Sequence, residues 1–211
     1  MSEINLTHSN GNKVKLTTPD TLAANRTFKL PGTDGTAGQI LQTDGNGKLS
    51  FVDPPFSVYD KWVGASTTTG RQDPYTNWVR HSYTDVHIAT GMSHSSGIFT
   101  FPQTGIYLVR FNADAYNTSN YERIIECSIE YTTNNSSYSA LQYSSGNVHN
   151  IGSYNIHSNI QVQAMFDVVN TSTHKVKFTC KAYNNESSLK LQSYSASGGF
   201  TYCDFTRVAD T

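Results

Sequence analysis

The sequence contains no long apolar run and almost no net charge, and both absences narrow the range of functions. Its 211 residues carry 15 lysines and arginines against 16 aspartates and glutamates, with no run of like charge. Nucleic-acid-binding proteins gather positive charge to meet phosphates, so we expect neither DNA nor RNA as a partner. No segment approaches the length of a membrane helix, and the first residues lack a basic head followed by an apolar run. We therefore expect neither membrane insertion nor secretion.

Cysteine is also scarce, and only Cys127, Cys180 and Cys203 occur. An odd number without a closely spaced pair does not indicate a disulfide framework. Each cysteine lies in a strand-like run, which favours buried, reduced thiols that pack as small apolar side chains. A bridge between Cys127 and Cys180 is the alternative, and nothing in the pattern supports it.

Recognisable catalytic and metal-binding motifs are missing. There is no nucleophile elbow and no pair of carboxylates on a recognisable scaffold, so we expect no enzyme. His149 and His157 flank a loop-like stretch, but neither a His-x-His pattern nor a Cys/His cluster is present. The glycines of residues 32–38 match neither a dinucleotide fingerprint nor a P-loop. We expect no bound metal and no cofactor.

Aromatic and small polar residues are abundant. Hydrophobic residues make up only 36% of the chain, but 13 tyrosines and 10 phenylalanines supply part of the missing apolar surface. Strand-length runs follow one another between turn residues, without helical spacing, which predicts an all-β protein with a C-terminal antiparallel sandwich or jelly roll. The strands expected in that part span residues 58–63, 76–80, 85–89, 106–111, 123–131, 140–143, 159–169, 175–183, 189–191 and 200–207.

Residues 97–113 have the clearest strand signal. Their alternating apolar residues are Phe99, Phe101, Tyr107, Val109 and Phe111. This alternation around Gly105 predicts two half-buried strands joined by a tight turn. Ile106 and Leu108 make the opposite face of the second strand apolar as well. We therefore expect that strand to be covered on both faces, inside a sandwich or against another subunit.

Residues 1–55 are predicted to form a separate glycine-rich unit. Their apolar pieces are too short to bury a core, so copies of the same chain wound around a common axis are the simplest source of contacts. Asp44–Gly47, between two short apolar runs, is typical of a hairpin loop. Pro54 and Pro55 cannot donate to a strand ladder and stiffen the chain, so we place the domain boundary there, with a head at residues 56–211.

Three short elements follow one another in this N-terminal unit. They are Leu30-Pro31, Gly35-x-x-Gly38-Gln39 and Thr43-Asp44-Gly45-x-Gly47. Residues 22–51, which contain them, resemble a segment common in bacteriophage tail-fibre and virion-appendage proteins. The resemblance implies a small β-rich trimeric stem that attaches the protein to a virus particle, and hence a virion protein assembled in the host cytoplasm.

A second resemblance concerns the head and rests on the spacing of five residues. These are Phe99, Gly105, Tyr107, Val109 and Phe111. The spacing is similar to the central pattern of the globular heads of complement C1q and the tumour-necrosis-factor (TNF) superfamily, with Val109 where phenylalanine is usual. Residues 197–202 resemble the last turn and strand of that fold, whereas His81, His87 and Met92 depart from its pattern. The resemblance implies a jelly roll that forms a homotrimer through aromatic strands along a threefold axis.

Two groups of residues are candidates for the contacts that hold the trimer together and for the contacts with a receptor. We assign the first jointly to the core and the trimer interface: Phe99, Phe101, Gly105, Tyr107, Val109, Phe111, Phe200 and Tyr202. The second lies in polar stretches rich in Tyr, Asn and Ser, a composition that suits recognition surfaces and plain soluble loop tips equally. Its candidate receptor-binding residues are Asn117, Asn120, Tyr121, Asn135, Tyr138, Tyr143 and Asn147.

These observations favour a non-enzymatic structural protein of a bacteriophage virion. We expect a trimeric fibre or appendage that meets other virion proteins through its N-terminal segment and binds host-surface carbohydrate or protein through its jelly-roll head. A capsid decoration, cement or head-fibre protein with a purely structural role is the main alternative. A secreted lectin-like recognition protein is a more distant one, disfavoured by the missing signal peptide and collagen-like Gly-x-y run.

Overall fold

The computed structural model describes residues 3–17, 20–80, 87–118, 124–148, 150–151, 154–184, 186–193 and 200–211. The chain divides into two compact units, Met1–Asp53 and Pro54–Thr211. The division falls next to the proline pair, while the stem and head roles assigned to the two parts stay predictions. No helix in the described part of the chain has the length and apolar character needed to cross a membrane.

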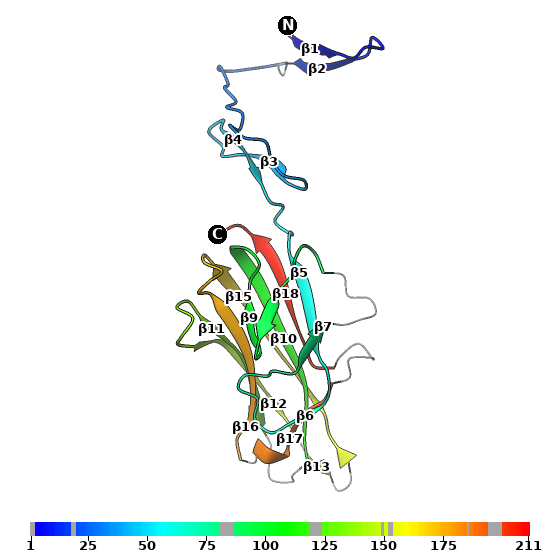
Figure 1. Cartoon of the computed structure of the whole chain (residues 1–211), viewed down its shortest axis with the longest axis vertical. Coiled ribbons are helices and arrows are strands. Elements are labelled where there is room, and N and C mark those ends of the chain that lie inside the picture. Colours follow the sequence, from blue (N-terminus) through cyan, green and yellow to red (C-terminus); the bar gives the residue numbers. More distant parts are fainter. Residues whose placement is uncertain are drawn as a thin grey trace. The chain divides into compact units, whose positions relative to one another are not determined.

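The N-terminal unit contains two antiparallel hairpins (Figure 1). Their strands are β1 (Glu3–Thr7) with β2 (Lys13–Thr17), and β3 (Ile40–Thr43) with β4 (Leu49–Val52). The second hairpin has its loop at the predicted position. There the Asp44 carboxylate accepts hydrogen bonds from the backbone N–H groups of Asn46 and Lys48, at 2.8 and 3.0 Å. This side chain satisfies backbone donors that the turn leaves unpaired.

The apolar side chains of the N-terminal unit remain largely uncovered, and none of the residues whose burial is described there is buried. The exposed large hydrophobic residues are Ile4, Leu6, Leu22, Phe28, Leu30, Ile40, Leu41 and Phe51. A two-stranded hairpin alone is marginally stable in water because it buries so little apolar surface. The unit as described therefore lacks a hydrophobic core of its own.

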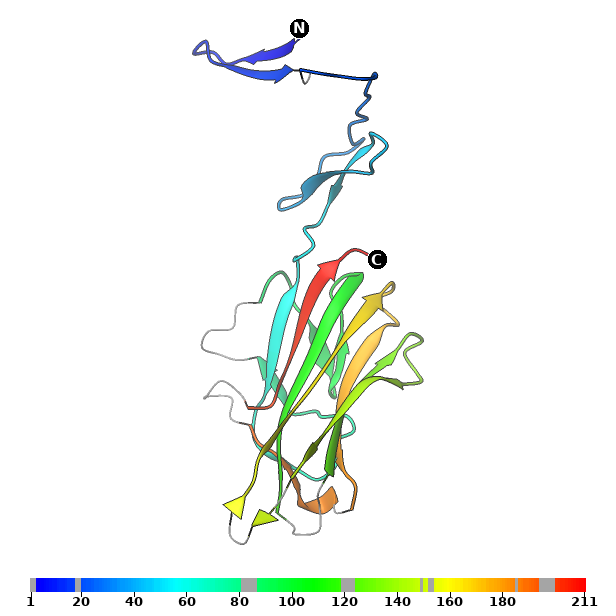
Figure 2. The same ribbon diagram turned by 180° about the vertical axis from the view of Figure 1, so that it is seen from behind.

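The C-terminal unit consists mainly of two antiparallel sheets packed face to face (Figures 1 and 2). The first sheet comprises β5 (Tyr59–Gly64), β6 (Thr68–Thr69), β7 (Trp78–Arg80), β10 (Gly105–Asn117), β15 (Ser158–Val168), β17 (Leu189–Leu191) and β18 (Tyr202–Ala209). The second sheet comprises β8 (Ser93–Ser95), β9 (Ile98–Thr100), β11 (Ile124–Thr132), β12 (Ser139–Asn147) and β16 (Lys175–Ala182). The described residues contain no α-helix, so the predicted all-β class is confirmed.

Strand β10 is the centre of the first sheet. It pairs with β15 along one side and with β18 and then β17 along the other. Figure 2 shows the neighbouring strands β5, β18, β10 and β15 in cyan, red, green and yellow. The remaining elements of the unit are β13 (Asn150–Ile151), β14 (Tyr154–Asn155) and the single 3-10 turn η1 (Glu186–Ser188).

Two strand predictions need correction. The described part of the predicted strand 85–89 is not a strand, because Ile88 makes only an isolated bridge to Tyr59. The strand predicted at 140–143 extends to Asn147, because β12 continues its pairing with β11 through small polar residues that gave no apolar alternation.

The segment 97–113 contains the two predicted strands, but they belong to opposite sheets. Strand β9 lies in the second sheet and β10 in the first, so the turn before Gly105 carries the chain across the sandwich. The alternating aromatic residues of the two strands consequently meet in the core, where the rings of Phe101 and Tyr107 lie 4.7 Å apart. Edge-to-face contacts of Trp78 with Phe111 and Phe178 continue this aromatic core.

All three cysteines are buried free thiols, in agreement with the favoured expectation. Cys127 and Cys180 lie directly opposite each other on β11 and β16, and Cys203 lies on β18 of the other sheet. Burial raises the pKa of Cys127 and of Cys203 well above the ordinary value for a thiol. Cys127 and Cys203 therefore remain protonated, apolar core side chains at neutral pH.

Gly105 gives a first testable prediction. Its φ is +142°, and a Cβ atom there would lie 2.3 Å from Nε of Arg207 and 2.8 Å from the carbonyl oxygen of Ala209. We expect Gly105→Ala to lower the free energy of unfolding by about 2–4 kcal/mol, because backbone strain adds to a steric clash. Urea denaturation measures the change. Gly70→Ala is the control. The φ of Gly70 is +82°, but the atom nearest to an added Cβ is 3.9 Å away, so backbone strain alone should lower the stability of this variant. Equal losses in the two variants would contradict the role of the clash.

Candidate functional site

The outer face of the second sheet carries a regular polar pattern. Along β11 its outward residues are Glu126, Ser128 and Glu130, and along β16 they are Lys181, Thr179 and Lys177. Alternate residues of a strand point to the same side, and the residues between these are buried in the core. The strand register places each glutamate opposite a lysine and the serine opposite the threonine.

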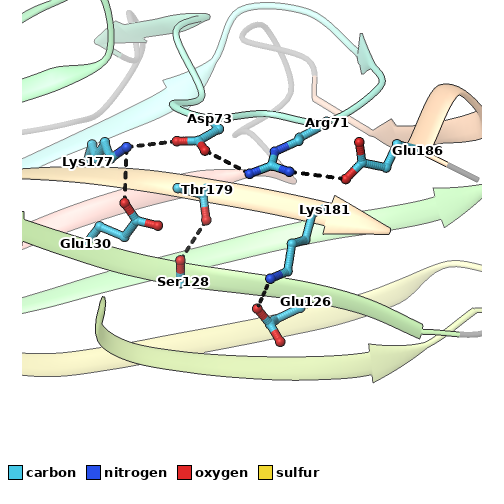
Figure 3. A network of polar contacts seen from close by, with 9 residues as sticks. All are labelled: Arg71, Asp73, Glu126, Ser128, Glu130, Lys177, Thr179, Lys181 and Glu186. Atoms are coloured by element: carbon cyan, nitrogen blue, oxygen red, sulfur yellow. Dashed lines mark hydrogen bonds and ion pairs between the residues drawn. The ribbon is translucent and has the colours of Figure 1, made fainter. Parts of the chain in front are cut away.

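This register produces two ion pairs on either side of a hydroxyl pair (Figure 3). Nζ of Lys181 lies 2.8 Å from Oε1 of Glu126, and Nζ of Lys177 lies 3.1 Å from Oε2 of Glu130. Between them the hydroxyl oxygens of Ser128 and Thr179 are 2.6 Å apart. Because serine and threonine are short and their neighbours are long, the middle row is lower than the two rows beside it.

One end of the low row is closed by residues 70–74, here called the strap. Gln72 and Cys180 exchange two backbone hydrogen bonds of 2.9 Å, so the strap extends the sheet beyond the edge of β16. Arg71 and Asp73, on either side of Gln72, take part in the outer polar network (Figure 3). Asp73 pairs with Arg71 at 3.0 Å and with Lys177 at 2.8 Å.

The other end of the low row is bordered by Tyr143 of β12, which lies opposite Ser128 in the register and is 64% exposed. Together these groups surround a hollow of about 150 Å³, here called the outer-sheet hollow. Its lining comes from β11, β12, β16 and the strap and includes Asp73, Glu126, Ser128, Glu130, Tyr143 and Thr179. The arrangement offers hydrogen-bonding groups on the floor and sides and an aromatic ring at one end.

The charges around the hollow are nearly balanced and fixed in pairs. The basic side chains are Arg71, Lys177 and Lys181, and the acidic ones are Asp73, Glu126, Glu130 and Glu186. The hydrogen bond from Lys177 holds the pKa of Asp73 below its ordinary value of 3.8, and the bond to Glu126 raises the pKa of Lys181. Both groups therefore stay charged around neutral pH.

The lowered pKa of Asp73 predicts that the stability of the fold depends on pH. A carboxyl group with a lowered folded-state pKa stabilises the fold above its ordinary pKa of 3.8 and loses that contribution as the pH falls through the lowered value. We expect the unfolding free energies of the wild type and Asp73→Asn to differ by a constant amount between about pH 5 and 8, and to converge below about pH 4. Urea denaturation at stepped pH measures this. A difference that persists unchanged at low pH would contradict the ionic role of Asp73.

The structure does not place all the candidate receptor-binding residues in exposed loops, as the sequence predicted. Asn120 and Tyr121 lie outside the described residues. Asn117 is not in an exposed loop, and that expectation is wrong: it is fully buried at the end of β10, where its side-chain oxygen accepts a 2.6 Å hydrogen bond from the Ser188 hydroxyl. Its polar neighbours in the sequence gave no sign that β10 continues to this residue.

The other four candidates lie on or beside β12. Asn135 is exposed in the turn between β11 and β12 with a φ of +59°, a conformation that asparagine tolerates well. Tyr138 follows that turn, and its ring lies under Nζ of Lys177 at 4.9 Å. Tyr143 and Asn147 lie in a strand rather than a loop. Tyr138 and Tyr143 thus lie beside the polar network, whose charged members were not among the sequence-predicted site residues.

Six of the residues assigned jointly to core and interface are buried within a single chain. They are Phe99, Phe101, Gly105, Tyr107, Val109 and Phe111. The hydroxyl of the buried Tyr107 donates a 3.0 Å hydrogen bond to the carbonyl of Gln103, and burial raises the pKa of this side chain to about 12. By contrast, Phe200 is 45% exposed, and Tyr202 faces outward with Nζ of Lys61 4.9 Å from its ring centre.

The outer face of the first sheet carries a partly uncovered apolar group. Ile106 and Leu108 are half-buried, so the expected cover on both faces of this strand is incomplete within one chain. Leu108 lies opposite Met165 of β15, which is 52% exposed. Beside them Arg110 pairs with Asp204 at 2.8 Å, and burial raises the pKa of Asp204 although the guanidinium opposes this. This surface, here called the first-sheet face, is a candidate contact between chains.

In the described residues, no group of three or more His, Cys, Asp or Glu side chains is placed to hold a metal ion. His157 lies 2.6 Å from Asp114, its acidic partner, and His149 lies outside the described residues.

Comparison with known proteins identifies the fold. No family model matches the chain, and no curated protein matches it in sequence. Among solved structures, Eiger TNF from S. frugiperda aligns with a TM-score of 0.55 and 13% identity, over 75% of this chain and 96% of that chain. Murine APRIL aligns over 71% of this chain and 98% of that chain, with 11% identity and a TM-score of 0.48.

The likeness to Eiger TNF confirms the predicted jelly-roll sandwich of the TNF-like type. Identity this low shows the fold alone. The resemblance of residues 22–51 to phage fibre segments is not addressed by these neighbours and stays a prediction.

Proposed function

We propose that the chain is a non-enzymatic, homotrimeric appendage protein of a bacteriophage virion. Its N-terminal unit attaches to other virion proteins, and its TNF-like jelly-roll head binds a molecule on the host surface. The observation that carries the homotrimer is the first-sheet face, where Met165 of β15 is 52% exposed beside the half-buried Leu108 of the central strand β10. A contiguous exposed apolar patch is typical of a protein contact, and we assign this face to the contact between chains.

Two features of the N-terminal unit support the virion role. Residues 22–51 resemble phage fibre segments, and their apolar side chains, such as Phe28 and Leu30, are exposed in the single chain. Three copies side by side would cover such side chains, which a single hairpin cannot do. A virion protein of this kind is assembled in the host cytoplasm.

The head is proposed to bind rather than to catalyse. In the outer-sheet hollow, Glu126 and Glu130 are each engaged by a lysine, and the hydroxyl of Ser128 is paired with that of Thr179 rather than with a base. Activated nucleophiles need a neighbouring base, which this arrangement does not supply. Balanced, paired charges with an aromatic edge instead suit reversible recognition.

The homotrimer is tested by measuring the mass in solution. Size-exclusion chromatography with light scattering on the full chain of 23.3 kDa should give about 70 kDa, the mass of three copies. We expect Met165→Glu to shift the protein towards monomer, because a charge is costly in a buried apolar contact. Tyr143→Glu is the control, since Tyr143 is also more than half exposed, at 64% against 52% for Met165, but lies on the second sheet. A monomeric wild type would overturn the proposed homotrimer.

A purely structural role on the capsid, as a decoration, cement or head-fibre protein, is the alternative. It is favoured by the fact that each acidic group of the hollow, such as Glu130, already has a basic partner within the chain. Locating the protein on phage particles by electron microscopy and testing whether the purified trimer competes with phage adsorption separate the two roles. Competition supports host binding, and its absence supports the structural role.

A further inference from the structure

We infer that the outer-sheet hollow is a binding site for one neutral sugar residue, with Tyr143 stacking against the sugar ring. This inference rests on the proposed function of the head as a host-binding domain, and it names both the site and the class of ligand. It follows from the size of the hollow, the chemistry of its floor and sides, its charge balance and its exposed aromatic edge.

The size of the hollow suits a single six-membered ring. Its volume is about 150 Å³, and a cavity of ~150 Å³ in a protein accommodates benzene. The space exists because Ser128 and Thr179 are short and lie between the longer ion-paired side chains of Glu126 and Glu130. One sugar unit at the end or edge of a glycan could enter a space of this size.

The floor and sides of the hollow match hydroxyl groups, which donate and accept hydrogen bonds at once. Each ionised carboxylate has about four acceptor sites and each lysine three donors, so the pair of Glu126 and Lys181 has capacity beyond its own 2.8 Å contact. The same holds for Asp73 between Arg71 and Lys177. A sugar hydroxyl can therefore donate to a carboxylate while it accepts from the neighbouring cation.

The charge balance selects an uncharged ligand. Three basic and four acidic side chains take part in the ion pairs around the hollow. An anionic ligand such as a sulfated sugar would compete with the carboxylates for Arg71, Lys177 and Lys181, and a cationic ligand would compete for the acids in the same way. A neutral polyhydroxyl ligand uses the spare hydrogen-bonding capacity without breaking an ion pair.

Tyr143 is the aromatic ring that remains available for stacking. The rings of Tyr138 and Tyr183 lie near Nζ of Lys177 and of Lys181, at 4.9 and 5.9 Å. In the described part of the chain no such cation covers Tyr143, which is 64% exposed at the open edge of the hollow. Its apolar ring face can pack against the C–H groups of a pyranose while the hydroxyls face the polar floor.

The inference is tested with neutral methyl glycosides as probes. Saturation-transfer difference NMR on the full-length protein with methyl α-glucoside, α-galactoside and α-mannoside should detect binding of at least one probe. Tyr143→Ala should weaken that binding at least about tenfold, which is the loss of one stacking contact, whereas Tyr143→Phe should retain it. Phe56→Ala, which removes an exposed aromatic ring that does not line the hollow, should also retain it.

Three results would overturn the inference. They are the absence of binding for all three methyl glycosides, binding that Tyr143→Ala leaves unchanged, and a preference for a sulfated monosaccharide over its neutral counterpart. The thermal unfolding of Tyr143→Ala should match that of the wild type, because the side chain is largely exposed.

Cell binding separates failure of this inference from failure of the proposed function. The labelled wild-type trimer is applied to a panel of bacterial strains, before and after periodate oxidation of surface sugars or protease treatment. Binding that Tyr143→Ala and periodate both abolish supports the hollow as the receptor site. Binding that only protease abolishes overturns the sugar site but leaves host attachment standing. Glycoside binding without binding to any strain supports the site and contradicts host attachment.

Discussion

Replacement of Phe99 by alanine is expected to lower the free energy of unfolding by about 3–5 kcal/mol. Phe99 is fully buried, and although it belongs to β9 of the second sheet its ring also contacts residues from other parts of the sandwich. The centres of the Phe178, Phe205 and Trp78 rings lie 5.6, 4.9 and 5.9 Å from its own. The substitution would therefore leave a cavity bordered by both sheets, which the rigid strands could fill only in part.

Urea denaturation at one fixed protein concentration measures this loss, because the unfolding of the proposed homotrimer would depend on concentration. Phe200→Ala is the matched control: it removes the same side chain at a site that is 45% exposed, and it should change the stability by no more than about 0.5 kcal/mol. A comparable loss in both variants would contradict the placement of Phe99 in the core and of Phe200 at the surface.

Asp60→Ala is expected to lower the free energy of unfolding by about 3–4 kcal/mol, which is the second large effect. The Asp60 carboxylate is 1% exposed and accepts hydrogen bonds from the backbone N–H of Met92 at 2.6 Å, from Nη2 of Arg80 at 2.9 Å and from Nε1 of Trp62 at 3.0 Å. Removal of the carboxylate leaves three donors from separate segments without their shared acceptor. A buried group that loses its partner costs more free energy than the bond itself contributes.

Two further variants make this prediction specific. Asp60→Asn keeps the shape and one acceptor oxygen, so it should lose less stability than Asp60→Ala. Glu126→Ala also removes a carboxylate from an ion pair, but the pair with Lys181 is partly exposed, and the loss should be about 0–1 kcal/mol. Equal losses for Asp60→Ala and Glu126→Ala would show that the shared acceptor at Asp60 does not hold the surrounding segments together.

Local patterns in the sequence predicted the strands better than their arrangement. The alternation of Phe99, Tyr107 and Phe111 identified buried strand faces, and Asp44-Gly45 identified a hairpin, because these signals depend on neighbouring residues alone. Whether β9 and β10 pair or lie in opposite sheets depends on contacts with β16 and β18, which are distant in the chain. Alternation therefore could not distinguish a hairpin from a connection between sheets.

The candidate site was predictable only in part for the same reason. The alternation of Glu126, Ser128 and Glu130, and of Lys177, Thr179 and Lys181, is visible in the sequence as two polar strand faces. Whether these two faces form ion pairs and a hollow depends on a strand register that joins residues about fifty positions apart, and on the backbone bridge between Gln72 and Cys180. Nothing around Gln72 in the sequence indicates that bridge. The tyrosines beside the hollow were found because their composition suggested recognition, although Tyr143 lies in a strand and not in the predicted loop.

The buried thiols make the opening of each sheet separately measurable. A thiol reagent reaches such side chains only when the surrounding structure opens, so the labelling rate reports the free energy of that opening. Cys127 and Cys180 report on the second sheet and Cys203 on the first. Mass spectrometry of the labelled peptides would show whether the two sheets open together, as one cooperative unit, or whether the first sheet, with its half-covered apolar face, opens before the second.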